Sequence, residues 1–362
     1  MRSFDTVFYH PVEGPTLIRT IRATAPIRIC DNGGWTDTWF ARHGSVFHIA
    51  VSPLAKVKLE AFHQNDLANQ ILINAENYGD QYLIDRPNGI YGRHKLLEAV
   101  FDLIPVPDGL AVKATIQCSV PSGASIGTSA AVTVALLGAL DRLTDGDRSN
   151  YQIARTAQRV ETEMLGQQCG IQDQLASAFG GINYIEMNDY PHAKVMELAI
   201  EPSILQELEN RLCLFYTGIS HNSSDVHTMV IRSLESEGSA SPKLAPLRLT
   251  AAQSRDAILE GNFPALGRAM TASTRGQENL HPALTGPDHH VIIDIARRHK
   301  ALGWKVNGAG GHGGSVTVLC NKDPETKQEM IHEVLQQNPK YLLIPTKLAA
   351  KGLTTTIEEH PQ

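Results

Sequence analysis

The segment Pro121-Ser-Gly-Ala-Ser-Ile-Gly-Thr-Ser-Ala-Ala131 indicates the fold and the chemistry more directly than any other part of the sequence. It follows residues 110–120, where apolar residues take every second position, as in a half-buried strand. It opens residues 130–143, whose apolar spacing predicts a helix. Small residues let backbone N–H groups approach an anion closely, and a helix N-terminus adds partial positive charge. We interpret 121–131 as a phosphate-binding loop; the alternative is an ordinary strand-to-helix turn.

This loop is not a Walker loop, because no Gly-Lys-Ser/Thr triplet ends it and the lysine of a P-loop is missing. Two hydroxyl side chains, Thr128 and Ser129, stand at the start of the helix, where they could cap it or coordinate Mg²⁺. The candidates for contact with a nucleotide are Pro121, Ser122, Gly123, Ala124, Ser125, Ile126, Gly127, Thr128, Ser129 and Ala130.

Two carboxylates follow the loop. Glu161 lies within the apolar stripe of a predicted helix at 151–165, and burying an unpaired carboxylate costs several kcal/mol. It is either paired with an arginine, such as Arg155 or Arg159, or it is a metal ligand. Asp173 stands at the opening of a short predicted helix at 172–179, where it could cap the helix or act as a general base.

Two further segments are rich in glycine. Ala25-Pro-Ile-Arg-Ile-Cys-Asp-Asn-Gly-Gly-Trp-Thr-Asp37 combines short hydrogen-bonding side chains with one flat apolar ring, which suits a polyhydroxylated ligand; a plain tight turn is the alternative. Gly308-Ala-Gly-Gly-His-Gly-Gly314 has the spacing of a dinucleotide-binding loop, but a strand follows it where a helix is required. We expect it to pack beside the loop at 121–131.

The composition narrows the classes of protein. The 362 residues suggest two domains, or one large domain with two lobes, and the 42% of hydrophobic residues can form a substantial core. A net charge of −6 argues against nonspecific binding of nucleic acid. The longest apolar run is too short to span a membrane, the N-terminus lacks the pattern of a secretion signal, and five scattered cysteines indicate reduced thiols. We therefore expect a cytoplasmic protein with no membrane and no nucleic-acid partner.

The periodicity predicts an α+β protein with a seam near residues 185–205. Strands are predicted at 110–120, 211–216 and 315–319, and helices at 130–143, 151–165, 172–179, 202–209, 223–237, 246–260, 287–302 and 324–337.

Together these segments resemble the GHMP kinases, the superfamily of galactokinase, homoserine kinase, mevalonate kinase and phosphomevalonate kinase. Residues 25–37, 121–131 and 305–314 are similar to its three motifs, in the family's order. Gly33-Gly-Trp-Thr-Asp37 is similar to the fucokinase group, and Gly170-Ile-Gln-Asp-Gln174 to the D-glycero-D-manno-heptose 7-phosphate kinases. Both groups phosphorylate the anomeric hydroxyl of a sugar.

The resemblance implies a two-lobed GHMP kinase fold, with a ribosomal-protein-like N-terminal lobe at 1–190 and a ferredoxin-like, helix-rich C-terminal lobe at 191–362. It implies ATP and Mg²⁺ as cofactors and a sugar or sugar phosphate as the small-molecule partner; a homodimer is one candidate assembly. The chain departs from the family pattern at Thr128, His221 and His312, which bears on the identity of the sugar.

The resemblance also implies roles for individual residues. Asp173 falls on the catalytic aspartate, Arg28 on the arginine beside it, and Ser129 and Glu161 on the magnesium ligands. Gly310 is a further candidate for nucleotide contact, and the substrate candidates are Gly34, Trp35, Thr36, Asp37, Gly181 and Tyr216. The expected activity is transfer of the γ-phosphate of ATP to a sugar hydroxyl. The alternatives are a catalytically silent sugar or nucleotide sensor on the same fold, or a GHMP kinase for a non-sugar alcohol.

Overall fold

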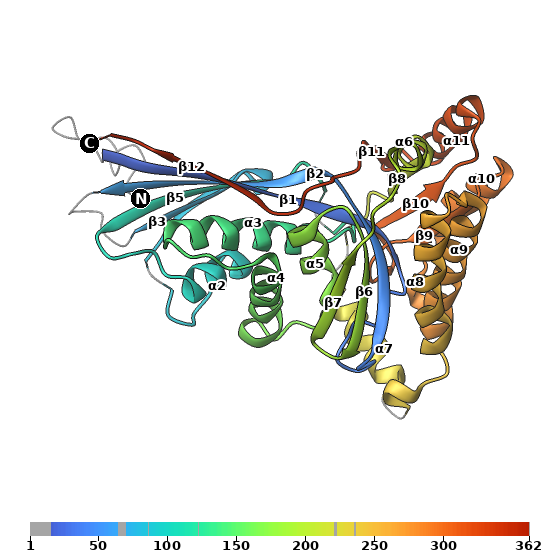
Figure 1. Ribbon diagram of the computed structural model, residues 1–362, viewed down its shortest axis with the longest axis horizontal. Coiled ribbons are helices and arrows are strands. Elements are labelled where there is room, and N and C mark those ends of the chain that lie inside the picture. Colours follow the sequence, from blue (N-terminus) through green and yellow to red (C-terminus); the bar gives the residue numbers. More distant parts are fainter. Residues whose placement is uncertain are drawn as a thin grey trace.

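The computed structural model describes residues 16–63, 70–85, 87–121, 123–220, 223–234 and 237–361. Its larger sheet has eight strands in the order β12-β1-β2-β5-β3-β4, and β6 and β7 join it through β2 (Figure 1). These strands are β1 (Thr16–Asn32), β2 (Gly44–His63), β3 (Ile71–Ala75), β4 (Asp80–Ile84), β5 (Leu110–Gln117), β6 (Ile182–Asp189), β7 (His192–Glu197) and β12 (Thr354–Glu359). Only β3 and β5 run parallel; the other pairs are antiparallel.

One face of this sheet is covered by helices (Figure 1). They are α2 (Lys95–Leu103), α3 (Thr128–Leu143), α4 (Asn150–Arg159) and α5 (Gln172–Phe179), with a π-helical turn, η3 (Val160–Met164), directly after α4. The central helix α3 is buried on nearly all sides, because its side chains are small or aliphatic and it lies between the sheet and its neighbouring helices. It therefore fixes the loop at its N-terminus relative to β1.

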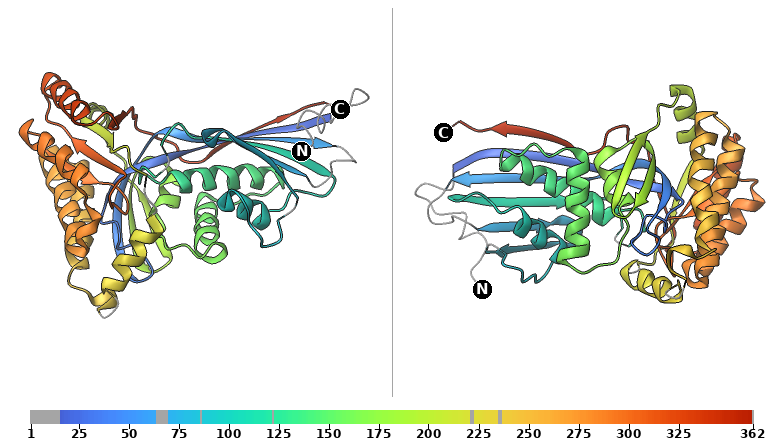
Figure 2. Two further views of the ribbon diagram at one scale, coloured as in Figure 1. Left: turned by 180° about the vertical axis from the view of Figure 1, so that it is seen from behind. Right: turned by 60° about the horizontal axis from the view of Figure 1, so that its bottom comes forward.

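The second sheet is antiparallel, with the order β11-β8-β10-β9. Its strands are β8 (Leu212–Tyr216), β9 (Gly303–Val306), β10 (Ser315–Leu319) and β11 (Leu342–Ile344). The helices of this part are α6 (Pro202–Arg211), α7 (Ser223–Leu234), α8 (Leu244–Leu259), α9 (Phe263–Leu280), α10 (Pro287–Arg298) and α11 (Pro324–Gln337). Figure 2 shows α8, α9 and α10 at the end of the molecule away from β12. Short 3-10 turns occur at η2 (Glu76–Tyr78), η4 (Gly238–Ala240) and η5 (Pro282–Leu284).

The predicted α+β class is confirmed, and the helices at 172–179 and 324–337 and the strand at 315–319 are confirmed to the residue. The helix predicted at 151–165 is α-helical only to Arg159 and then widens into the π-turn. Helices α2 and α9 and most strands of the large sheet were not predicted. Strands β7 and β12 come after residue 190 in the sequence but lie in the first sheet. The two sheets therefore cannot be separated by one boundary in the sequence.

All five cysteines are free thiols, as predicted, although the Sγ atoms of Cys213 and Cys320 lie 3.7 Å apart. Among the helices in the described ranges, none combines the length and apolarity that a bilayer crossing requires.

Candidate active site

A cavity of about 280 Å³ lies where β1, the loop before α3, the turn before α5 and the loop after β9 meet. Its lining comes from within residues 28–38, 123–130, 161–174 and 308–309, with His227 of α7 at one side. All four segments contain residues that the sequence analysis singled out. The fold thus brings chemistry-bearing residues from distant parts of the chain around one space.

The predicted phosphate loop is anchored through its carbonyl groups. The backbone N–H of Arg28 donates to Ile126 O at 3.0 Å, Arg28 Nη1 donates to Ser125 O at 2.6 Å, and Ser315 Oγ donates to Ala124 O at 2.7 Å. Among the described residues no side chain caps α3, whose first turn follows Gly127 at a φ of +72°. The first N–H groups of a helix have no intrahelical acceptor, so this fixed loop offers donors to an anion.

The third glycine segment packs beside this loop, as predicted. A Cβ added to Gly308 would lie 2.6 Å from Ser125 O and 3.1 Å from Arg28 Nη2. The φ of Gly308 is +59°, so glycine is required there for both reasons. Gly310 faces elsewhere: its Cβ would meet Leu284 O, and it does not line the cavity.

Arg28 and Asp173 are in direct contact. Arg28 Nε donates to Asp173 Oδ1 at 2.8 Å, and the guanidinium is 3% exposed while the Asp173 side chain is 30% exposed to the cavity. The capping alternative for Asp173 is wrong, because no cap hydrogen bond starts α5 from that residue. Asp37 serves the start of α5 instead, since its Oδ2 accepts from the N–H groups of Ile171 and Gln172 at 3.0 and 3.1 Å.

Asp37 and Glu161 are buried carboxylates that line the cavity. Burial raises the pKa of Asp37 to about 6, opposed by its backbone hydrogen bonds. Burial also raises the pKa of Glu161 to about 7; a hydrogen bond from Gln174 Nε2 at 2.7 Å opposes that shift, and the charge of Asp173 adds to it. Each group therefore releases its proton less readily than it would in water, and positive charge in the cavity would favour its ionised form.

The arginine-pairing alternative for Glu161 is wrong. Arg159 Nε pairs with Glu163 Oε2 at 3.0 Å, and Arg155 Nη1 donates to Gln158 Oε1 at 3.0 Å. The π-turn at Val160–Met164 carries Glu161 toward the cavity and Glu163 toward solvent. Such turns recur at functional sites because the extra residue redirects the side chains that follow it.

The residues present fit a magnesium ion. Ser129, Thr128, Glu161 and Asp173 line the same cavity, and the buried Thr128 Oγ1 has no hydrogen-bond partner among the described residues. Within those ranges no group of three or more His, Cys, Asp or Glu side chains forms a ready-made metal site. Proteins typically hold Mg²⁺ through one or two carboxylates and the phosphates of a substrate.

The substrate candidates divide into two groups. Trp35 and Asp37 line the cavity, whereas Gly34, Thr36, Gly181 and Tyr216 do not. Gly34 lies behind the lining against Asp31 and Gln172, and Thr36 Oγ1 donates to Gly33 O. Gly181 donates its N–H to Ala349 O, and Tyr216 is a buried residue of β8. Of the loop candidates, Gly123 through Ala130 line the cavity, Pro121 lines a neighbouring one, and Ser122 lies outside the described residues.

Several lining residues were not predicted, chiefly Gln172, Gln174 and His227. Across the described ranges, eight buried side-chain N or O atoms have no hydrogen-bond partner, and four of them belong to residues lining this cavity: Trp35 Nε1, Thr128 Oγ1, Gln172 Oε1 and Gln174 Oε1. Buried polar atoms are normally satisfied, so this concentration indicates a polar ligand. In the sequence, the position of Gln172 and Gln174 on either side of Asp173 is the feature that could have indicated these two residues.

A second cavity, of about 440 Å³, continues from the first along the phosphate loop. The two share Gly123, Thr128, Ser129 and Gln167. Tyr78 and aliphatic side chains line much of the second cavity: Leu96, Leu97, Ile116, Val120 and Val132. A ligand with an apolar ring at one end and anionic groups at the other would fit along the pair.

Comparison with known proteins agrees with this geometry. The models of the GHMP kinase N-terminal and C-terminal domains match residues 91–181 and 254–340. The mevalonate kinase of Thermococcus onnurineus is 30% identical over 252 residues, which are 68% of this chain and 69% of that protein. The chain belongs to the GHMP kinase family. The predicted class of enzyme, a phosphotransferase, is thereby confirmed.

Within the family, this GHMP kinase is similar to proteins named for sugars. A bifunctional fucokinase/GDP-fucose pyrophosphorylase of Arabidopsis thaliana is 25% identical over 86% of the chain, which spans only 31% of that protein. A D-glycero-alpha-D-manno-heptose 7-phosphate kinase of Campylobacter jejuni is 26% identical, covering 87% of the chain and 93% of that enzyme. The crystal structure of a D-glycero-D-manno-heptose 1-phosphate kinase from Bacteriodes thetaiotaomicron superposes with a TM-score of 0.70 at 22% identity, covering 93% of this chain and 98% of that one. The predicted GHMP kinase fold is confirmed.

Proposed function

We propose that this GHMP kinase transfers the γ-phosphate of ATP to a hydroxyl of a sugar, at the anomeric carbon. One observation carries the proposal: the carboxylate of Asp173, held by Arg28, faces the same cavity as the loop at the start of α3. A kinase needs an acceptor-side base and a phosphate cradle across one small space. The names of the fucokinase and heptose phosphate kinase relatives support a sugar as the acceptor.

The nucleotide would lie along the two cavities. Its phosphates would accept hydrogen bonds from the N–H groups of the loop at 123–129, where the dipole of α3 favours negative charge. Its base would enter the second cavity, which offers an aromatic ring and aliphatic side chains. This orientation leaves the first cavity for the acceptor, next to Asp173.

Asp173 would accept the proton of the attacking hydroxyl. Its contact with Arg28 holds the carboxylate in place at the cavity, as a base that must meet the hydroxyl requires. Ser129 and Glu161 would hold Mg²⁺, which when bound neutralises charge on the phosphates. An anomeric hydroxyl is more acidic than an ordinary alcohol, so one carboxylate suffices as a base.

The other side of the cavity suits a sugar. The ring of Trp35 makes an edge contact with the ring of His227, at 4.6 Å between ring centroids. The Nε1 atom of Trp35 has no hydrogen-bond acceptor among the described residues. Asp37 and the amide of Gln172 add fixed hydrogen-bonding groups nearby. A sugar presents several hydroxyls to such groups and C–H bonds to an aromatic surface, whereas a simple aliphatic alcohol has a single hydroxyl.

The test is an assay of ADP release with ATP, Mg²⁺ and a panel of free sugars and sugar phosphates, followed by NMR of the product. The proposal expects ADP in proportion to at least one sugar, with the new phosphate on the anomeric carbon. Binding of a sugar without ADP release would indicate a sensor. ADP release only with a non-sugar alcohol would contradict the choice of acceptor.

A further inference from the structure

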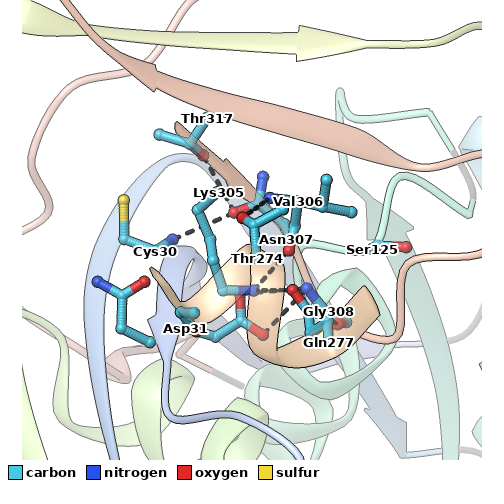
Figure 3. A network of polar contacts seen from close by, with 12 residues as sticks. Cys30, Asp31, Ser125, Thr274, Gln277, Lys305, Val306, Asn307, Gly308 and Thr317 are labelled. Atoms are coloured by element: carbon cyan, nitrogen blue, oxygen red, sulfur yellow. Dashed lines mark hydrogen bonds and ion pairs between the residues drawn. The ribbon is translucent and has the colours of Figure 1, made fainter. Parts of the chain in front are cut away.

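A buried lysine of the second sheet lies behind the cavity without lining it. Lys305 belongs to β9, and its side chain is 1% exposed. Its Nζ donates to Gln277 Oε1 at 2.7 Å and to Val306 O, and lies 3.3 Å from Asp31 Oδ1 (Figure 3). Three acceptors thus surround one ammonium group. Burial lowers the pKa of Lys305, and the charge of Asp31 opposes that shift.

Asp31 connects this lysine to the candidate active site. The carboxylate is 1% exposed, and both of its oxygens accept from the N–H of Gly308, at 3.1 and 3.0 Å. Its Oδ1 also lies 4.0 Å from Arg28 Nη1. A buried carboxylate needs compensating charge, and Asp31 has two cations next to it, Lys305 and Arg28.

Arg28 in turn has two carboxylates beside it. It lies 2.8 Å from Asp173 and 4.0 Å from Asp31, and its Nη1 donates to Ser125 O. The four side chains carry two positive and two negative charges, with the shorter contacts pairing Lys305 with Asp31 and Arg28 with Asp173. Without the lysine, a single guanidinium would serve both carboxylates, and the buried Asp31 would attract it away from Asp173.

A second path leads from Lys305 to the phosphate loop. Gln277 of α9 accepts from Lys305 through Oε1 and donates through Nε2 to Gly308 O at 2.8 Å (Figure 3). The lysine therefore also fixes which way the amide of Gln277 points. Gly308, held at its N–H by Asp31 and at its carbonyl by Gln277, lies directly against Ser125 and Arg28.

We infer that Lys305 is a positioning residue for phosphoryl transfer: by compensating Asp31 it keeps the guanidinium of Arg28 on Asp173 and on the phosphate loop. This inference rests on the proposed function. Lys305 itself touches neither the cavity nor the reacting groups. Its effect is on the orientation of Arg28, and misplacement of a catalytic group by about 1 Å can cost about 100-fold in rate.

The test is a double-mutant cycle with Lys305→Met, Asp31→Asn and the double variant, and the exposed Lys322→Met as a matched control. For each protein, kcat and both KM values are measured by ADP release, the Kd for ATP by titration without the sugar, and folding by thermal unfolding. Lys305→Met is expected to lower kcat about 10- to 100-fold, with the Kd for ATP within about 3-fold of wild type. The double variant is expected to differ in kcat from Asp31→Asn by less than about 3-fold, because the negative charge that Lys305 compensates is already absent in Asp31→Asn.

Two results would overturn the inference: a kcat for Lys305→Met within about 2-fold of wild type, or an equal loss of kcat from Lys305→Met in the wild-type and Asp31→Asn backgrounds. If the single variant does not fold, the double variant is compared with Asp31→Asn alone: a change in kcat of less than about 3-fold supports the inference, and a loss of about 10-fold or more overturns it. A folded wild-type protein that phosphorylates no sugar would instead contradict the proposed function, so the two failures are distinguishable.

Discussion

Arg28 Nε lies 2.8 Å from Asp173 Oδ1, which joins β1 to the first turn of α5 across 145 positions in the sequence. The same guanidinium donates to Ser125 O, so one side chain contacts both the proposed base and the phosphate loop. Because Arg28 is buried, it has little freedom to follow one of these partners without the other. The distance between base and loop is thus set before any substrate binds.

Replacing Asp173 with asparagine should abolish proton acceptance while keeping the shape of the side chain. We expect kcat to fall by about 100-fold or more, because a general base typically contributes that much, and the affinity for ATP to stay near that of wild type. Steady-state kinetics and an ATP titration check this. Asp189→Asn, at an exposed carboxylate of β6, is the control. A variant at Asp173 with a near-normal kcat would remove this residue as the base.

The buried carboxylates predict a pH dependence of stability in the absence of divalent cations. The pKa of Glu161 is raised from 4.5 to about 7 and that of Asp37 from 3.8 to about 6 in the folded protein. Between the ordinary and the raised values, the unfolded chain holds fewer protons than the folded protein, so stability decreases as the pH rises from about 4 to about 7. In Glu161→Gln the free energy of unfolding should decrease less over this range, and by pH 8 the loss should be smaller than in the wild type by up to roughly 3 kcal/mol.

Denaturant unfolding at several pH values, with EDTA and then with Mg²⁺, measures this effect. Mg²⁺ should stabilise the wild type more than Glu161→Gln, because the variant has lost the charge that the ion would neutralise. Glu163→Gln, at the exposed carboxylate paired with Arg159, should behave like the wild type. Equal slopes for wild type and Glu161→Gln would show that Glu161 titrates normally.

The close approach of the third glycine segment can be tested at Gly308. Alanine there would combine a φ of +59° with a Cβ 2.6 Å from Ser125 O. We expect the free energy of unfolding to fall by about 2–4 kcal/mol and the affinity for ATP to weaken, because the phosphate loop must move. Gly238→Ala is the matched control: its φ is +56° and nothing lies within 4 Å of its Cβ, so it should cost only about 1 kcal/mol. Equal losses in the two variants would contradict the contact.

Trp35 should affect the acceptor and not the nucleotide. Trp35→Phe keeps an aromatic ring beside His227 but removes the unpartnered Nε1 donor. We expect the KM for the sugar to rise about 10-fold with little change in the Kd for ATP, as expected for loss of one hydrogen bond in a buried site. Trp304→Phe, at a residue of β9 beside Arg297, is the control. A change in ATP affinity alone would place Trp35 on the nucleotide side.

Local patterns predicted some elements well and missed others for physical reasons. Helix α5 ends where it was expected because Gly180 follows it, at a φ of +69° and with Gly352 too close for a side chain. Helix α9 was missed because Gly267 and Gly276 lower its helix propensity. Both are required by packing: a Cβ on Gly267 would lie 2.2 Å from Leu302 O, and one on Gly276 would lie 2.6 Å from a methyl carbon of Leu247. Those neighbours are distant in the chain, so the sequence alone does not reveal them.

In the candidate site, too, features of the local sequence were predicted and contacts between distant residues were not. The glycine-rich segments, Glu161 and Asp173 were found because each breaks a local pattern. The contacts of Lys305 were not, since Asp31 and Gln277 come from β1 and α9 and meet it only in the folded chain. The role of His227 was missed for the same reason: nothing in α7 distinguishes it until the helix lies against Trp35.

The pairing of β12 with β1 has a consequence for how the protein is made. Residues 354–359 form the edge of the first sheet, next to the strand that carries Arg28. A nascent chain that has not yet reached residue 354 exposes the unpaired backbone of β1 from Arg19 to Thr24, a template for pairing with other chains. A chain truncated before residue 354 would therefore keep an uncovered strand edge and should aggregate more readily than the full chain.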